Sequence, residues 1–197
     1  GNNTDLPLRE TTVPRPVSAY GSDKLGSEQS AYIAGVVHGV PTTSFRFFNV
    51  YGPRQDPFSP YSGVISIFVN RIASGDSVTI YGDGRQSRDF VYVGDIVRKL
   101  IAGMENASTE APVFNACTGR STALLELVDT IARLLKTKPE IRFEAARKGD
   151  IRHSLGSPEA ATAALGFQAG TTLKAGLRRL LDSLISEVAT ASRRGTK

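Results

Sequence analysis

Two periodicities divide the chain into helical and extended segments. Apolar residues at helical spacing predict helices over residues 17–38, 64–74, 96–104, 121–135, 157–165 and 172–188. Runs that are rich in β-branched and aromatic residues, or that alternate, predict strands over residues 42–50, 77–81, 88–95, 111–117 and 140–146. Because strands and helices alternate almost throughout, the pattern predicts an α/β fold with a largely parallel sheet.

Turn and cap residues refine these bounds. Gly39 and Pro41 are the usual stop signals for the first helix. A serine or threonine is expected to cap the helix over 121–135, and Asp95 precedes its apolar run as a helix N-cap would. The segment 140–146 alternates as an edge strand should.

Composition narrows the classes of function. The chain has 197 residues, of which 40% are apolar, enough for the core of one large domain or two small ones. The net charge of +5 comes from scattered basic residues, which favours an anionic small molecule over nucleic acid. One cysteine and two histidines exclude an internal disulfide and a metal framework. No apolar run approaches a membrane span, so we expect no membrane partner and a cytoplasmic location.

The stretch "SAYGSDK" contains the first candidate for chemistry. Tyr20 and Lys24 are four positions apart, so a helix places both side chains on one face. An ammonium group near a phenol favours the phenolate, which is the form that a general base needs. Taken alone, the pair is also what an ordinary solvated helix face would show.

Four motifs in order change this interpretation. They are "SAYGSDK" at 18–24, "RFFNVYGPRQ" at 46–55, "IYGDGRQSRDFVYVGDI" at 80–96 and "RKGDIRHS" at 147–154. In order and spacing they resemble the extended short-chain dehydrogenase family, specifically its sugar-nucleotide epimerases and dehydratases. Within that family the resemblance is closest to the UDP-glucose and UDP-N-acetylglucosamine 4-epimerases, which are isomerases, and it extends to about residue 185.

The resemblance implies NAD as cofactor and a UDP-sugar as substrate. Tyr20 would exchange a proton with a sugar hydroxyl, and Lys24 would bind the nicotinamide ribose, with Phe47 near the nicotinamide ring. In such enzymes NAD takes a hydride from C4 of the sugar, and the 4-keto intermediate turns before the hydride returns to its other face. The protein supplies position and proton transfer.

The resemblance also implies a set of substrate-binding residues. Asn49 would bind a phosphate oxygen, although it could instead cap the turn that follows. Arg88 and Arg147 would bind the diphosphate through planar guanidinium groups, the alternative being two surface arginines. Asp150 would bind either the sugar hydroxyls or its own loop. The small side chain of Ser154 would leave room for a 2-acetamido group.

The uracil and its ribose are expected at a further set of positions, partly through backbone groups. These positions are Val64, Thr79 and Tyr81.

The chain departs from the family in its first part. The glycine-rich turn that receives the NAD pyrophosphate is missing, as are the N-terminal βαβ units that carry it. Gly1 matches the last residue of the motif that contains the family's catalytic serine or threonine, so we expect a fragment that does not turn over alone. Strands left without neighbours would expose an edge that can pair with another chain.

The resemblance implies two domains and a homodimer. Residues 1–53 and about 86–106 would be the end of the Rossmann NAD-binding domain, and about 54–85 and 107–185 the substrate domain, followed by a polar tail over 186–197. The helix that carries Tyr20 and Lys24 would form the dimer interface, for which its stretch 32–37 is apolar enough, although that stretch could equally belong to the core. Alternatives are a dehydratase, decarboxylase or reductase of the same family, or a module that binds nucleotide sugars without chemistry.

Overall fold

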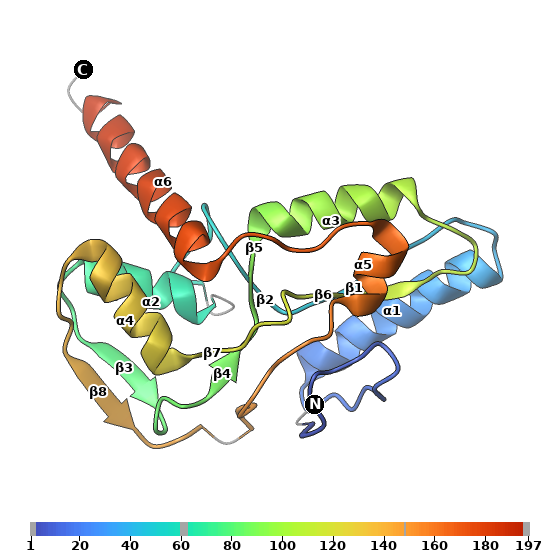
Figure 1. The fold of residues 1–197 in the computed structure, drawn as a ribbon, viewed down its shortest axis with the longest axis horizontal. Coiled ribbons are helices and arrows are strands. Elements are labelled where there is room, and N and C mark those ends of the chain that lie inside the picture. Colours follow the sequence, from blue (N-terminus) through green and yellow to red (C-terminus); the bar gives the residue numbers. More distant parts are fainter. Residues whose placement is uncertain (1–2, 60–62, 148, 195–197) are drawn as a thin grey trace.

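The computed structural model describes residues 3–59, 63–147 and 149–194 (Figure 1). Its helices are α1 (Ala19–Val36), α2 (Val64–Ala73), α3 (Val93–Glu105), α4 (Leu124–Leu135), α5 (Glu159–Leu165) and α6 (Leu173–Arg194). Its strands are β1 (Ser44–Phe47), β2 (Asn49–Tyr51), β3 (Val78–Tyr81), β4 (Ser87–Arg88), β5 (Phe90–Tyr92), β6 (Val113–Ala116), β7 (Thr122–Ala123) and β8 (Ile141–Glu144). Three parts of the sequence predictions fall outside the described residues: the motif match at Gly1, Lys148 of the last motif, and residues 195–197 of the polar tail.

The predicted α/β class with mainly parallel pairing is confirmed. Strand β1 pairs with β6, β2 with β5 and β3 with β8, all in parallel, whereas β4 and β7 are antiparallel. Helices α3 and α1 lie on opposite sides of the β1–β6 pair (Figure 1). Among the helices of the described residues, none combines the length and the apolar character that a membrane span requires.

Two predicted strands are each divided into two. The segment predicted over 42–50 breaks at Phe48, because the chain changes partner there: the Phe48 N–H donates to the Ala116 carbonyl, and the Asn49 N–H donates to the Asp89 carbonyl. The segment predicted over 88–95 breaks at Asp89 and ends at Tyr92, where α3 begins. Both breaks reflect partners that are distant in sequence, which local propensity does not encode.

Two predicted caps are wrong. The N-cap position of α3 is Tyr92, and Asp95 lies inside the first turn, where its buried carboxylate accepts hydrogen bonds from Thr171. The N-cap position of α4 is Ala123, which makes no side-chain cap. The Ser121 hydroxyl instead donates to the Ser87 hydroxyl at 2.7 Å.

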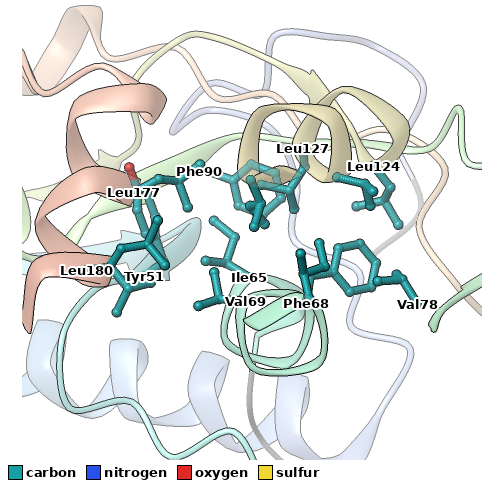
Figure 2. Close-up of a cluster of buried hydrophobic side chains, with 14 of the residues drawn as sticks. Tyr51, Ile65, Phe68, Val69, Val78, Phe90, Leu124, Leu127, Leu177 and Leu180 are labelled. Atoms are coloured by element: carbon teal, nitrogen blue, oxygen red, sulfur yellow. The ribbon is translucent and has the colours of Figure 1, made fainter. Parts of the chain in front are cut away.

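The main hydrophobic core lies where α2, α4 and α6 meet (Figure 2). Leu127 of α4 and Leu177 of α6 are both fully buried, and Ile65 of α2 is 1% exposed. Burial of each side chain of this size stabilises the folded state by about 1.5–3 kcal/mol relative to leaving it exposed. These contacts fix β3 beside β8, because Val78 and Ile80 belong to the same cluster.

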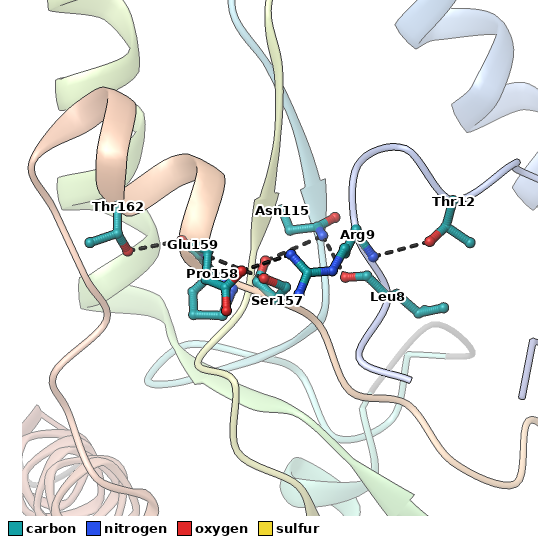
Figure 3. A network of polar contacts seen from close by, with 8 residues as sticks. All are labelled: Leu8, Arg9, Thr12, Asn115, Ser157, Pro158, Glu159 and Thr162. Carbon is teal, nitrogen blue, oxygen red and sulfur yellow. Dashed lines mark hydrogen bonds and ion pairs between the residues drawn. The ribbon is translucent and has the colours of Figure 1, made fainter. Parts of the chain in front are cut away.

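The segment before α1 is held against β6 by polar contacts (Figure 3). The Asn115 side-chain amide donates to the Leu8 carbonyl at 2.9 Å, and the Leu8 N–H donates to the Leu155 carbonyl at 2.8 Å. Arg9 forms an ion pair with Glu159 at 2.7 Å. The chain that leads into the Tyr20 helix is therefore anchored at several points.

The proposed division into two domains stays a prediction. Strand β6 lies in the range predicted for the substrate domain, yet it pairs along its length with β1 of the range predicted for the NAD-binding domain. Helix α5 contacts β6 and α3.

Two glycines of α1 provide a matched test of its packing. At Gly35, an added Cβ atom would lie 2.7 Å from the Ala111 Cβ and 3.0 Å from the Thr42 hydroxyl, whereas nothing lies within 4 Å at Gly26. We expect Gly35→Ala to lower the free energy of unfolding by about 1–3 kcal/mol. Gly26→Ala should raise it by about 0.5–1 kcal/mol, because alanine favours the helix. Urea denaturation measures both, and equal effects would contradict the close approach at Gly35.

Candidate active site

Helix α1 brings Tyr20 and Lys24 together at its first turns. Ser18 is the N-cap, and its hydroxyl accepts a hydrogen bond from the Gly21 N–H at 3.1 Å. The Lys24 Nζ lies 5.3 Å from the centre of the Tyr20 ring, as the four-residue spacing predicts. The Tyr20 side chain is 62% exposed, so its ring is accessible to a ligand.

An ion pair fixes this helix on strand β1. The Arg46 guanidinium donates two hydrogen bonds of 2.8 Å to the Glu28 carboxylate and a third of 2.9 Å to the Glu10 carbonyl. The hydrogen bond to Glu28 raises the pKa of Arg46 above its ordinary value, against the opposing effect of burial. Glu28 lies one turn beyond Lys24, so the pair limits how far α1 can move relative to the sheet. Sequence reasoning missed it, because Glu28 lies outside the four motifs and is 18 residues away from Arg46.

Phe47 and Asn49 lie where β1 ends and β2 begins. Phe47 is 54% exposed, and the Asn49 backbone N–H donates to the Asp89 carbonyl at 3.0 Å. The carboxyl ends of parallel strands are where ligands bind in open α/β sheets. Phe47 therefore lies at the carboxyl end of the β1–β6 pair, whereas Asn49 begins β2, which pairs with β5.

A second group of predicted residues lies at the ends of β3 and β8. Tyr81 is the last residue of β3, and the Arg147 guanidinium carbon lies 3.7 Å from the centre of its ring. The Asp150 N–H donates to the Arg147 carbonyl at 3.2 Å, so its backbone closes this loop, and the role of its side chain stays a prediction. Thr79 lies within β3, and Val64 is the first residue of α2.

Arg88 on β4 belongs to the same group. Its side chain is partly buried and donates to the carbonyls of Ser87 at 2.9 Å and Arg152 at 3.4 Å. Burial lowers the pKa of Arg88 below its ordinary value, and the nearby charge of Asp150 opposes that effect. The hydrogen bonds that the Arg88 guanidinium donates thus go to carbonyls, and no carboxylate pairs with it among the ion pairs of the described residues.

Ser154 is placed by a short parallel bridge to Ser87. The Ser154 N–H donates to the Ser87 carbonyl, and the Ser87 N–H donates to the Arg152 carbonyl, each at 3.0 Å. The His153 Nδ1 lies 2.9 Å from the Ser87 hydroxyl, and Arg152 forms a bidentate ion pair with Asp83. No local pattern predicts these contacts of Arg152 and His153, because their partners are more than 60 residues away.

The buried carboxylate of Asp89 connects the surrounding segments. It accepts hydrogen bonds from the N–H groups of Thr118, Gly119 and Gly156 at 2.9, 2.9 and 3.4 Å, and from the Thr118 hydroxyl at 2.7 Å. Burial raises its pKa, and these hydrogen bonds oppose the rise. Asp89 therefore has a structural role.

The arrangement offers two kinds of chemistry. Tyr20 with Lys24 can transfer a proton at an exposed position. Arg88 and Arg147 can bind an anion, because none of the ion pairs in the described part of the chain includes either of them. A ligand that carries an acidic group and a reacting hydroxyl would use the arginines for the first and the Tyr20–Lys24 pair for the second.

Comparisons with known proteins find similar sequences. The model of the NAD dependent epimerase/dehydratase family matches residues 1–117. The putative UDP-glucose 4-epimerase of Methanocaldococcus jannaschii is 33% identical over 183 residues, which cover 92% of this chain and 58% of that protein.

Solved structures of epimerases are also similar to this chain. The UDP-glucose 4-epimerase of Thermotoga maritima, with UDP-glucose, is 35% identical, with a TM-score of 0.89 over 95% of this chain and 60% of that one. The UDP-N-acetylglucosamine 4-epimerase of Methanobrevibacter ruminantium, with UDP-N-acetylmuramic acid, is 34% identical, with the same TM-score and coverage. Several similar structures contain NAD. The chain thus spans less than two thirds of the length of these proteins.

Asp89→Asn tests whether the buried carboxylate holds these segments together. The asparagine oxygen can still accept from Thr118, but its NH₂ group would then face the Gly119 N–H, which leaves two donors in contact. We expect the free energy of unfolding to fall by about 2–3 kcal/mol in urea titrations. The control Asp83→Asn changes an exposed carboxylate and should have little effect. Comparable losses in both variants would contradict the role of Asp89.

Proposed function

Because the chain belongs to the NAD dependent epimerase/dehydratase family, we propose that the complete polypeptide is an isomerase that inverts C4 of a UDP-sugar. The observation that carries the proposal is the contact of Lys24 with Tyr20 on an exposed face of α1. A protein that only binds nucleotide sugars has no need of a proton-transfer pair. The epimerases among the relatives and the solved structures support the same reaction.

In this mechanism Tyr20 accepts the proton of the sugar 4-hydroxyl and later returns it. The Lys24 ammonium, 5.3 Å from the ring, favours negative charge on the phenol oxygen while the proton is away. Glu28 and Arg46 hold the helix in place during the transfer. The chain thereby supplies proton transfer at a fixed position.

The residues present fit the reactive end of NAD. A phenol and an ammonium group suit the hydroxyls of the nicotinamide ribose, and the exposed ring of Phe47 suits the nicotinamide. NAD supplies the hydride acceptor and donor for C4, so a 4-keto sugar is the intermediate. The inactivity expected of this chain alone stays a prediction.

The anionic half of the substrate would lie against the second group of residues. Arg88 and Arg147 would bind the diphosphate, together with the side chain of Asn49. Backbone groups near Val64 and along Thr79 and Tyr81 would hold the uracil and its ribose. Asp150 would bind sugar hydroxyls, and its backbone already closes the loop to Arg147.

The exposed apolar residues of α1 support a homodimer as the assembly. Ile33, Val36 and Val37 are 48%, 51% and 68% exposed, and all lie in the stretch predicted as the interface. A second copy that packs there would remove this apolar surface from water.

Tyr20→Phe is the direct test of the proposed reaction. With the complete polypeptide as its gene encodes it, we expect the interconversion of UDP-glucose and UDP-galactose, followed by chromatography, to fall by about 10²–10⁴-fold. Binding of UDP should persist. The control Tyr32→Phe, three turns further along α1, should retain activity. A wild-type protein that releases a 4-keto-6-deoxy product would be a dehydratase, and one that binds UDP-sugars without converting them would be a binding module.

Ser154→Tyr tests the breadth of the sugar site. Ser154 is small and partly buried, and the similar N-acetylglucosamine epimerase supports an acetylated substrate. We expect the tyrosine ring to fill the space for the 2-acetamido group and to lower turnover of UDP-N-acetylglucosamine by about tenfold or more. UDP-glucose serves as the internal control, since it lacks that group. Unchanged turnover of the acetylated sugar would contradict the assignment.

A further inference from the structure

The contact between Arg147 and Tyr81 is closer than the other cation–ring contacts of the described residues. The Arg147 guanidinium carbon lies 3.7 Å from the centre of the Tyr81 ring, whereas the other three contacts of this kind measure 5.3–5.5 Å. At the shorter distance the cation lies against the face of the ring, where its negative charge density is greatest.

The ring is attached to a firmly held backbone. Tyr81 pairs with Glu144 where β3 and β8 end side by side, and its carbonyl accepts a 2.6 Å hydrogen bond from the Gln86 side chain. Gln86 is only 7% exposed, so that hydrogen bond is shielded from water. Arg147, by contrast, is exposed and lies three residues beyond the end of β8. The fixed partner is the tyrosine, and the arginine is the residue that it restrains.

An aromatic partner affects an arginine differently from a carboxylate. A carboxylate binds the N–H edge of the guanidinium and compensates its charge, as Glu28 does for Arg46. A ring contacts the flat face, and the N–H edge and the full positive charge remain available to a ligand. Phosphate oxygens are the ligands that match this edge in two-point contacts.

We propose that Tyr81 is a positioning residue whose ring holds Arg147 so that its N–H edge faces the diphosphate of the nucleotide substrate. The inference rests on the proposed function and adds a role for the Tyr81 side chain beyond the backbone contacts assigned to its strand. The Asp150 N–H donates to the Arg147 carbonyl, and the charge of Asp150 raises the pKa of Arg88 against the effect of burial, so both arginines lie near Asp150.

A double-mutant cycle tests the proposal. Binding of UDP to the complete polypeptide is measured by calorimetry for the wild type, Tyr81→Leu, Tyr81→Phe, Arg147→Ala and the double variant Tyr81→Leu/Arg147→Ala. Tyr81→Leu should weaken UDP binding about three- to fivefold, the range of an exposed cation–ring contact. Tyr81→Phe should restore most of the affinity, because it keeps the aromatic face. Tyr81→Leu should have no further effect once Arg147 is alanine.

The control is Arg133→Ala, which removes an exposed arginine of α4 that pairs with Asp129. It should leave UDP binding within twofold of the wild type. If Tyr81→Leu weakens binding equally with and without Arg147, the ring contacts the nucleotide directly and the proposal is overturned. If the wild type binds no UDP, the proposed function fails and takes the inference with it. If only Arg147→Ala weakens binding, the inference alone fails.

A second readout needs no ligand. Phenylglyoxal modifies accessible arginines, and mass spectrometry identifies the site. Arg147 should react faster in ligand-free Tyr81→Leu than in the wild type or Tyr81→Phe, while Arg133 reacts at one rate in all three. Equal rates at Arg147 would show that the ring does not restrain it in solution.

Discussion

One buried carboxylate determines how the segments around the candidate site come together. Asp89 is fully buried, and burial of a charge is costly unless hydrogen bonds replace the water that it loses. The chain meets this demand with N–H groups from Thr118, Gly119 and Gly156, which belong to two distant segments. The backbone carbonyl of Asp89 also accepts the Asn49 N–H. Asp89 alone therefore fixes three features: its neighbour Arg88, the start of β2 at Asn49, and the loop that ends at Gly156.

Two other restraints place the remaining candidates on this frame. The core of α2, α4 and α6 holds β3 beside β8, so Tyr81 projects from a rigid strand end. The Arg46–Glu28 ion pair attaches α1 to β1 and so positions Tyr20 and Lys24. In each case the buried contacts are structural and the side chains that would meet a ligand are more exposed. This separation lets the site residues change partners on binding without loss of the fold.

The sequence correctly predicted the features that depend on residues close together in the chain. Tyr20 and Lys24 approach each other because helical geometry alone sets their spacing, and α1 begins and ends within two residues of the expected bounds. The breaks at Phe48 and Asp89 could not be predicted, because they arise where an extended segment changes its partner strand. Asp95 shows the same limit: its position before an apolar run suggested a cap, but Thr171, 76 positions later, determines its role.

The structure distinguishes arginines that pair with a carboxylate from arginines that do not, which residue type and motif cannot predict. Arg46 and Arg88 are both partly buried, yet the pKa of Arg46 is raised and that of Arg88 is lowered. The hydrogen bond to Glu28 outweighs burial at Arg46, whereas burial outweighs the nearby charge of Asp150 at Arg88. Folding has therefore already removed water from Arg88, and the hydrogen bonds that this arginine donates go to carbonyls rather than to a carboxylate. A diphosphate that binds there gains an attraction for which part of the desolvation cost is already met. Arg147, held by a ring rather than a carboxylate, follows the same principle by a different contact.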